Sequence, residues 1–193
     1  MAEAVTTAPN LAGALWPSST DNRLWRAILL AVLGSAFLAV LSQVEIPFWP
    51  VPQTMQTLGV MVIGMTYGSR LAGATVLLYL VEGAAGLPVF SGGASAAAFA
   101  GPTAGYLAGF LVAAVAMGWL CERGWDRNPV TAIAAMVIGD ALVFALGYAY
   151  LAYFLGDAAK AFEFGVLPFL VGDACKIALV AAGLGLAWKR LKK

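Results

Sequence analysis

Apolar residues run through this chain in six stretches, separated by short segments rich in polar residues, glycine or proline. The stretches cover residues 24–44, 54–67, 71–82, 104–121, 130–154 and 166–188. Because an α-helix rises 1.5 Å per residue, about 20 apolar residues cross the roughly 30 Å hydrocarbon core of a bilayer. The pattern therefore predicts an all-α integral membrane protein with six transmembrane helices, of which the second and third are short.

The composition also indicates a protein embedded in a lipid bilayer. Of the 193 residues, 62% are hydrophobic and 11% are charged, whereas soluble domains average roughly 45–50% apolar and about 25% charged residues. The formal net charge of +1 leaves no basic surface for a run of phosphates, so nucleic-acid binding is not expected. The chain has no histidine and only two distant cysteines, which excludes histidine-based zinc sites and Ser–His or Cys–His nucleophile pairs.

The segments outside the apolar stretches define the domain organisation. Residues 1–22 are small and polar, without a basic region ahead of an apolar core, so we expect a flexible cytoplasmic tail and not a signal peptide. Residues 23–193 form a single six-helix membrane domain. Residues 83–103 are glycine-rich and uncharged, which predicts a long re-entrant-like outer loop between the third and fourth helices that lines a cavity.

The distribution of basic residues orients the chain. Nine of the eleven Lys and Arg residues fall on the side of the membrane that holds both termini. They are Arg23, Arg26, Arg70, Arg123, Arg127, Lys189, Arg190, Lys192 and Lys193. The opposite side has Lys160, and Lys176 lies within the last stretch. Since cytoplasmic loops collect Lys and Arg, both termini are predicted to be cytoplasmic.

Four ionisable residues fall within or at the end of the apolar stretches: Glu82, Asp140, Asp173 and Lys176. An ionised side chain at a helix centre costs about 2.5–3.5 kcal/mol, so such a group is functional by default. Asp173 and Lys176 share one helix face, and with Glu82 they could form a pocket open to the outside. Alternatively, the pair only fixes helix packing. Asp140 could contact a ligand or another helix.

Two further sets of residues suggest contacts. Gln56 lies one turn inside the second stretch and could orient a ligand, whereas Thr54 is placed to cap that helix. Ala27 and Ala31 begin a row of small residues with four-residue spacing on the first helix. Such a row permits close approach of another transmembrane helix, which would make it a docking surface for a partner.

Four segments together carry a family resemblance. They are PVPQTMQTLGVMVIG (50–64), LLYLVEGAAGLPVFSGG (77–93), GPTAGYLAGF (101–110) and PFLVGDACKIALVA (168–181). In this combination the chain resembles the BioY family, the biotin-specific S components of energy-coupling factor (ECF) transporters of the bacterial cytoplasmic membrane.

The resemblance implies high-affinity capture of biotin from outside, with no cofactor and no enzymatic activity. Asp173 and Lys176 match the GDxxK motif and would be polar contacts, and the 83–103 loop would be the gate. Ala27 and Ala31 would meet the transmembrane coupling (T) subunit. Because the chain has no GxxxxGK[ST] segment, active uptake would also require ABC-type ATPase subunits.

Biotin's chemistry suits these residues. Asp173 can accept from the ureido N–H groups, and Lys176 can donate to the ureido oxygen or to the tail carboxylate. The aromatic residues Tyr79, Phe90, Tyr106 and Tyr148 could pack the thiophane ring.

Three alternatives remain open. The chain could be an S component for another vitamin, distinguished only by its pocket residues. It could be a small membrane enzyme that uses Asp140 and Asp173 as acid and base, although no nucleophile–base pair is visible. A scaffold protein would not need intramembrane Asp and Lys residues.

Overall fold

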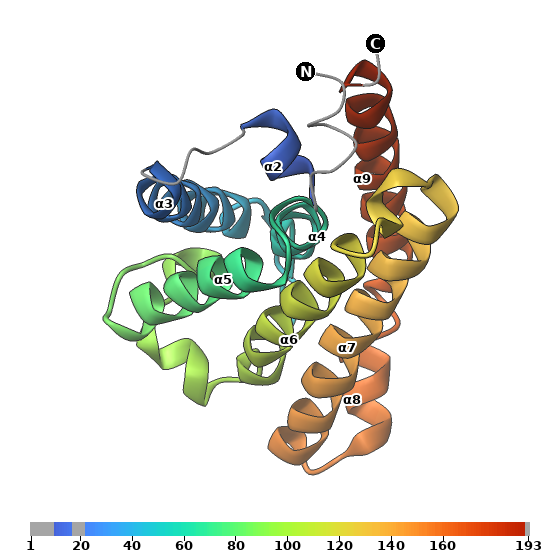
Figure 1. Cartoon of the computed structure of the whole chain (residues 1–193). Coiled ribbons are helices and arrows are strands. Elements are labelled where there is room, and N and C mark those ends of the chain that lie inside the picture. Colours follow the sequence, from blue (N-terminus) through green and yellow to red (C-terminus); the bar gives the residue numbers. More distant parts are fainter. Residues whose placement is uncertain (1–9, 17–21, 192–193) are drawn as a thin grey trace.

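The computed structural model describes residues 10–16 and 22–191, and nearly all of its ordered elements are helices (Figure 1). The helices are α2 (Leu11–Leu15), α3 (Arg23–Ser42), α4 (Gln56–Tyr67), α5 (Ser69–Ala84), α6 (Ala104–Cys121), α7 (Pro129–Leu155), α8 (Ala158–Gly165) and α9 (Leu170–Leu191). The described chain also contains the short 3₁₀ helices η2 (Ser91–Gly93), η3 (Ala96–Ala100) and η4 (Trp125–Arg127). The strands β1 (Glu45–Ile46) and β2 (Gln53–Thr54) pair antiparallel.

Four helices of the described chain are long and apolar enough to cross a membrane, namely α3, α6, α7 and α9. The prediction of an all-α fold is therefore confirmed, with four helices that fit membrane spans. Helices α4 and α5 have 12 and 16 residues, which correspond to about 18 and 24 Å of helix. Helix α4 packs against α2, α3, α5, α6, α7 and α9, so protein and not lipid surrounds most of its surface.

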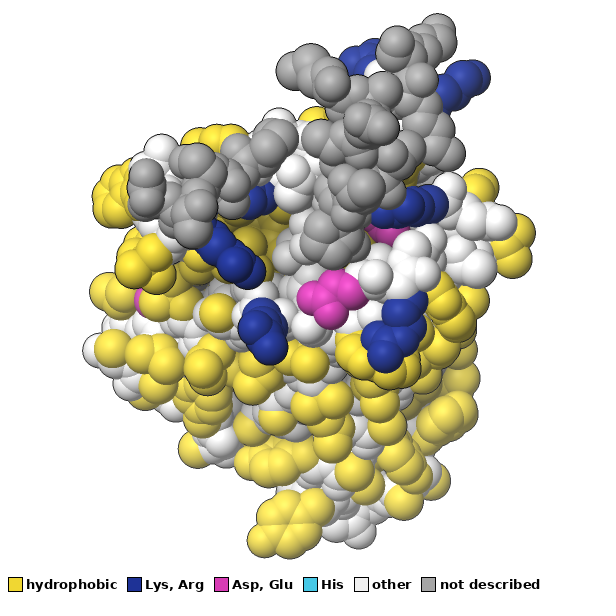
Figure 2. Space-filling model, in the orientation of Figure 1, with side chains coloured by type: hydrophobic (Ala, Val, Ile, Leu, Met, Phe, Trp, Pro, Cys, Tyr) yellow, Lys and Arg dark blue, Asp and Glu magenta, His cyan; other side chains and the backbone are white. Residues whose placement is uncertain are grey.

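The helices surround a central pair. Figure 1 shows α4 and α6 in the middle, with α3 and α5 on one side and α7 to α9 on the other. Helix α2 and the C-terminal end of α9 lie towards one end of the molecule, whereas α8 and the segment between α5 and α6 lie towards the other. On the face shown in Figure 2, the Lys and Arg side chains gather near the first end, above a broad apolar surface.

Two boundaries differ from the sequence prediction. The segment expected as a polar loop after α7 contains helix α8, because Asp157 caps it by accepting from the Lys160 N–H (3.1 Å). Helix α9 begins at Leu170 and not near residue 166, since Val166–Phe169 forms a turn around Pro168, which has no N–H to donate.

Part of the expected tail is ordered. Helix α2 is capped by Asn10, whose Nδ2 also donates to the Tyr67 carbonyl (3.1 Å). Arg26, near the start of α3, donates to the Ala12 carbonyl (2.6 Å). The α2 segment therefore connects the start of α3 to the end of α4. The rest of the predicted tail, residues 1–9 and 17–21, lies outside the described residues.

Glycines bring α6 and α7 into close contact. A Cβ atom at Gly109 would lie 2.9 Å from the Val143 Cα, so no larger residue fits without moving the backbone. This approach places Tyr106 and Phe110 of α6 beside Val143 and Phe144 of α7, where all four line one cavity.

A buried carboxylate links α9 to the turn between α6 and α7. Asp126 is 2% exposed, and its Oδ2 accepts from the Trp188 indole N–H (3.0 Å). Its other oxygen has no hydrogen-bond partner within the described chain. Burial raises the pKa of Asp126 above its ordinary value of 3.8, against the opposing effects of Trp188 and Arg127.

Asp126→Asn should change how stability depends on pH. Because the folded state holds the Asp126 proton more tightly than the unfolded state, the free energy of unfolding falls as pH rises from 3.8 through the raised pKa. Asparagine keeps an oxygen for Trp188 and carries no charge. We therefore expect the variant to be more stable than the parent above this range and to lose that advantage below it, in thermal unfolding in detergent micelles.

Asp157→Asn is the matched control with the opposite sign. The Lys160 backbone N–H lowers the pKa of the exposed Asp157 carboxyl, so its ionised form favours folding and the variant should gain nothing at neutral pH. A neutral-pH advantage of equal size in both variants would contradict this interpretation of Asp126.

Candidate functional site

A cavity of about 330 Å³ lies between α4, α6, α7 and α9. The 90–103 segment and the residues just before α4 complete its wall. Its lining is mostly apolar, and the charged side chains that line it, among the described residues, are Asp173 and Lys176. A mainly apolar cavity with a few convergent polar groups is typical of a small-molecule site.

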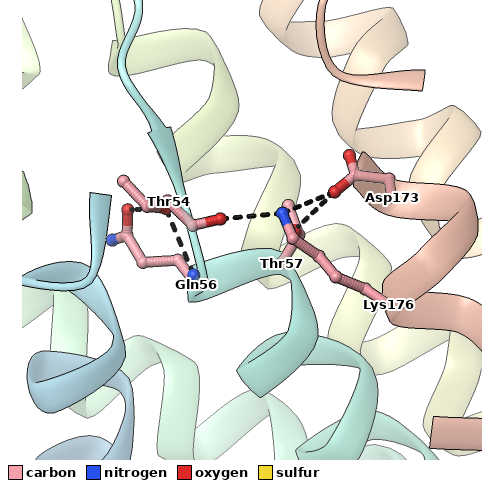
Figure 3. Close-up of polar contacts among 5 residues, drawn as sticks. All are labelled: Thr54, Gln56, Thr57, Asp173 and Lys176. Atoms are coloured by element: carbon pink, nitrogen blue, oxygen red, sulfur yellow. Dashed lines mark hydrogen bonds and ion pairs between the residues drawn. The ribbon is translucent and has the colours of Figure 1, made fainter. Parts of the chain in front are cut away.

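The Asp173–Lys176 pair is the polar centre of this wall (Figure 3). Lys176 Nζ donates to Asp173 Oδ1 (2.6 Å), to Thr57 Oγ1 (2.8 Å) and to the Thr54 carbonyl (2.7 Å). The Thr57 hydroxyl in turn donates to Asp173 Oδ1 (2.9 Å). The Asp173 and Lys176 side chains are 2% and 7% exposed. The three hydrogen bonds of the Lys176 ammonium and the charge of the Asp173 carboxylate therefore replace water as the partners of this ion pair.

The local sequence explains this geometry. Asp173 and Lys176 lie three residues apart near the start of α9, so their side chains leave the same helix face. Thr54 ends β2, and its carbonyl points at Lys176 because the β1–β2 pairing fixes the backbone just ahead of α4. Thr57 lies in the first turn of α4. The site thus depends on the contact between α4 and α9.

A second chain of hydrogen bonds runs from the cavity to α5. Gln56 Oε1 accepts from the Thr54 hydroxyl (2.9 Å), and Gln56 Nε2 donates to the Tyr79 hydroxyl (2.7 Å). Tyr79 donates to the Val89 carbonyl (2.8 Å) and packs edge-on against Phe90, with ring centroids 5.2 Å apart. Gln56 and Phe90 line the cavity, whereas Tyr79 is fully buried behind them and holds both in place.

The 90–103 segment is tied to neighbouring elements on its other side. Ser91 donates to Glu45 of β1, the Ser42 hydroxyl donates to the Val89 carbonyl (2.8 Å), and Gln43 Nε2 donates to the Phe90 carbonyl (3.0 Å). Several residues of this segment line the cavity, and these hydrogen bonds, together with the packing of Phe90 against Tyr79, connect it to the rest of the chain.

The structure gathers some of the predicted site residues and leaves others apart. Asp173, Lys176, Gln56, Phe90 and Tyr106 line the cavity.

Four of the predicted residues do not line it: Glu82, Tyr148, Tyr79 and Asp140. Glu82 accepts a hydrogen bond from the Ser35 hydroxyl of α3 on one of its two carboxylate oxygens. Tyr148 is half-buried and packs edge-on against Phe162 of α8 (6.3 Å). Tyr79 lies behind Phe90, as described above.

Asp140 lies behind the polar pair. It is near enough to interact electrostatically with both Asp173 and Lys176, and with Thr57 it borders a small void beneath the main cavity. Its Oδ1 is buried without a hydrogen-bond partner in the described chain. The structure therefore places Asp140 under the site and outside the lining of the main cavity.

Several residues of the cavity wall were not among the predicted site residues. They include Thr57 and the aromatic residues Phe110, Phe144 and Phe169. All three phenylalanines stand four residues from a predicted site residue: Tyr106, Asp140 and Asp173 respectively. Because side chains at i and i+4 share a helix face, this spacing was the signal available.

The small-residue row of α3 has two environments. Ser35 is fully buried and bonded to Glu82 of α5, whereas Ala27 and Ala31, nearer the start of the helix, are half-buried. At Ser35, the small-residue row therefore packs against α5 of the same chain.

A sequence model described as the BioY family matches residues 12–193. The chain belongs to the BioY family.

Two members of the family are similar to this chain over most of their length. The chain is 39% identical to "Biotin transporter BioY" of Rhizobium etli, over 88% of this chain and 93% of that one. It is 34% identical to "Biotin transporter BioY" of Thermotoga maritima, over 86% and 98% of the two chains. The family resemblance seen in the four sequence segments is thus confirmed.

A solved structure shares the fold. The crystal structure of the S-component for biotin from an ECF-type ABC transporter superimposes with a TM-score of 0.79, covering 89% of this chain and 95% of that chain at 24% identity.

A double-mutant cycle should reveal the cost of separating the buried pair. Lys176→Met leaves the Asp173 carboxylate buried without its cation, and we expect a loss of about 3 kcal/mol or more in the free energy of unfolding. Adding Asp173→Asn removes the charge and should restore much of that loss. Unfolding in micelles measures both, and additive losses in the double variant would contradict the coupling.

Proposed function

We propose that this chain captures biotin as the substrate-binding S component of an ECF-type transporter and takes part in its uptake across the cytoplasmic membrane. The observation that carries the proposal is the polar centre made by Asp173, Lys176 and Thr57 at the wall of an otherwise apolar cavity. Membership of the BioY family and the names of its relatives support the choice of biotin.

The polar centre suits a cyclic urea. A ureido group has two N–H donors and one carbonyl acceptor, so it needs a carboxylate and a cation side by side. Asp173 accepts from a ureido N–H, and Lys176 donates to the ureido oxygen. Every Lys176 donor already has a partner in the cavity described here, so biotin binding exchanges one of these bonds for a bond to ligand.

The remaining wall suits the rest of biotin. Phe90, Tyr106, Phe110 and Phe169 give the thiophane ring and the aliphatic tail an apolar surface. The tail carboxylate then extends towards the 90–103 segment, where Ser91 and Thr103 line the cavity. Gln56 and Asp140 act indirectly, because one orients Thr54 and Tyr79 and the other lies under the charged pair.

The membrane arrangement follows from the same proposal. Residues 23–193 form one membrane domain in which α4 and α5 complete the six crossings, and both termini face the cytoplasm. The cationic end seen in Figure 2 supports this orientation, since it lies opposite the 90–103 segment. The cavity is then open to the outside of a bacterial cytoplasmic membrane.

Transport requires partners in this scheme. A T subunit docks on the Ala27–Ala31 side of α3, and ABC-type ATPase subunits supply the energy. The 83–103 loop acts as the gate over bound biotin. Its few hydrogen bonds to Ser42, Gln43 and Glu45 are the contacts that hold it closed.

Variants of the charged pair test the substrate assignment. Asp173→Asn and Lys176→Ala should each weaken biotin binding by about 2 kcal/mol or more, about 30-fold, because each removes a charge-assisted hydrogen bond. Calorimetric titration of the purified protein measures the affinity, with riboflavin and thiamine as competing candidates.

Asp157 and Lys160 provide the matched control. They form an ion pair with the same three-residue spacing (3.4 Å), but at the surface of α8, so Lys160→Ala should leave the affinity unchanged. Unaltered binding in the Asp173 and Lys176 variants, or tight binding of another vitamin and not biotin, would sink the assignment.

Ser91→Ala tests the gate. Loss of the bond to Glu45 should speed biotin dissociation by about tenfold, since a hydrogen bond to a carboxylate contributes about 1.5–3 kcal/mol. A chase of labelled biotin measures the rate. Ser95→Ala, in the same segment and without a side-chain bond in the described chain, is the control, and equal rates in both variants would argue against this latch.

A further inference from the structure

Helix α6 presents a second site on the side away from the cavity. Tyr106, Leu107 and Phe110 line the cavity, and the opposite side of the same helix lines a separate open groove of about 480 Å³. The groove residues are Leu111, Val112, Val115, Ala116 and Trp119. Val112, Val115 and Trp119 are between 41% and 50% exposed, so the described chain leaves this apolar surface uncovered.

One end of the groove carries a fixed cation. The Arg123 guanidinium lies 3.2 Å above the centroid of the Trp119 ring, and its Nη1 donates to the Trp119 carbonyl (3.0 Å). A guanidinium has five N–H donors, and within the described chain this is its one hydrogen bond. Stacking on Trp119 orders the side chain and leaves donors for an external acceptor.

A second cation lies at the same end. Ser69 donates from its backbone N–H (2.8 Å) and its hydroxyl (2.9 Å) to Glu122 Oε1. Arg70 and Arg123 each follow one member of this bonded pair in the sequence, and both are exposed. Glu122 is held by Ser69, and neither arginine has a carboxylate partner among the described residues.

We propose that this groove binds one anionic phospholipid. An acyl chain lies along Val112, Val115 and Trp119, and the phosphate accepts hydrogen bonds from Arg123 with Arg70 nearby. An apolar groove that ends at a Trp and two arginines matches the two parts of such a lipid, because interfacial tryptophan and arginine lie at headgroup level. The inference rests on the proposed orientation, which places this end in the anionic cytoplasmic leaflet.

Competition between two lipids tests the proposal. The full chain in micelles is mixed with equal amounts of dioleoyl phosphatidylglycerol and dioleoyl phosphatidylcholine, and the lipid retained is counted by native mass spectrometry. We expect one phosphatidylglycerol to be retained in preference. Arg123→Gln should reduce its retention by about fivefold, the effect of removing one cation near an anionic headgroup, and Val115→Glu should abolish it.

Arg23→Gln is the charge-matched control. It removes an exposed arginine at the start of α3, a helix that packs on α4 and α5 and away from α6, so retention should not change. Equal retention of both lipids, equal loss in Arg23→Gln and Arg123→Gln, or a dimer broken by Val115→Glu would overturn the proposal. Biotin affinity, measured on the same variants, should be unaffected and reports separately on the cavity.

Discussion

The pairing of Asp173 with Lys176 is the interaction on which the site depends. In a chain whose interior and surroundings are both apolar, neither charge is tolerated without the other and without further hydrogen bonds. Thr57 and the Thr54 carbonyl supply those bonds from α4 and the strand before it. The requirement to satisfy two buried charges therefore fixes α9 against α4 and shapes the polar end of the cavity.

The rest of the structure can be understood as support for this contact. Glycines let α6 approach α7 closely and bring their aromatic residues to the cavity. Tyr79 of α5 bonds to Gln56 and packs against Phe90, so α5 supports two residues of the cavity wall without lining the cavity itself. The 90–103 segment closes the remaining side, where Ser91 bonds to Glu45 and the buried Phe90 packs against Tyr79.

How far the sequence predicts this arrangement depends on the kind of information involved. Hydropathy identifies the helices, because each must be apolar along most of its length. The pair Asp173–Lys176 is predicted as a site because an ionised side chain within an apolar helix is energetically costly and is therefore usually functional. Helix α8 was missed, since its sequence looks like a loop unless the Asp157 cap is noticed. The bond between Glu82 and Ser35 was not predicted, because Ser35 comes from a distant helix that no local pattern connects to Glu82.

If Asp173 and Lys176 together bind the ureido group of biotin, a crystal structure of the purified chain with biotin will show it. We expect the ureido ring against these two side chains, with one present partner of Lys176 Nζ replaced by the ureido oxygen and the tail directed towards the 90–103 segment. Biotin found elsewhere, or bound with all three Lys176 bonds to Asp173, Thr57 and Thr54 intact, would contradict it.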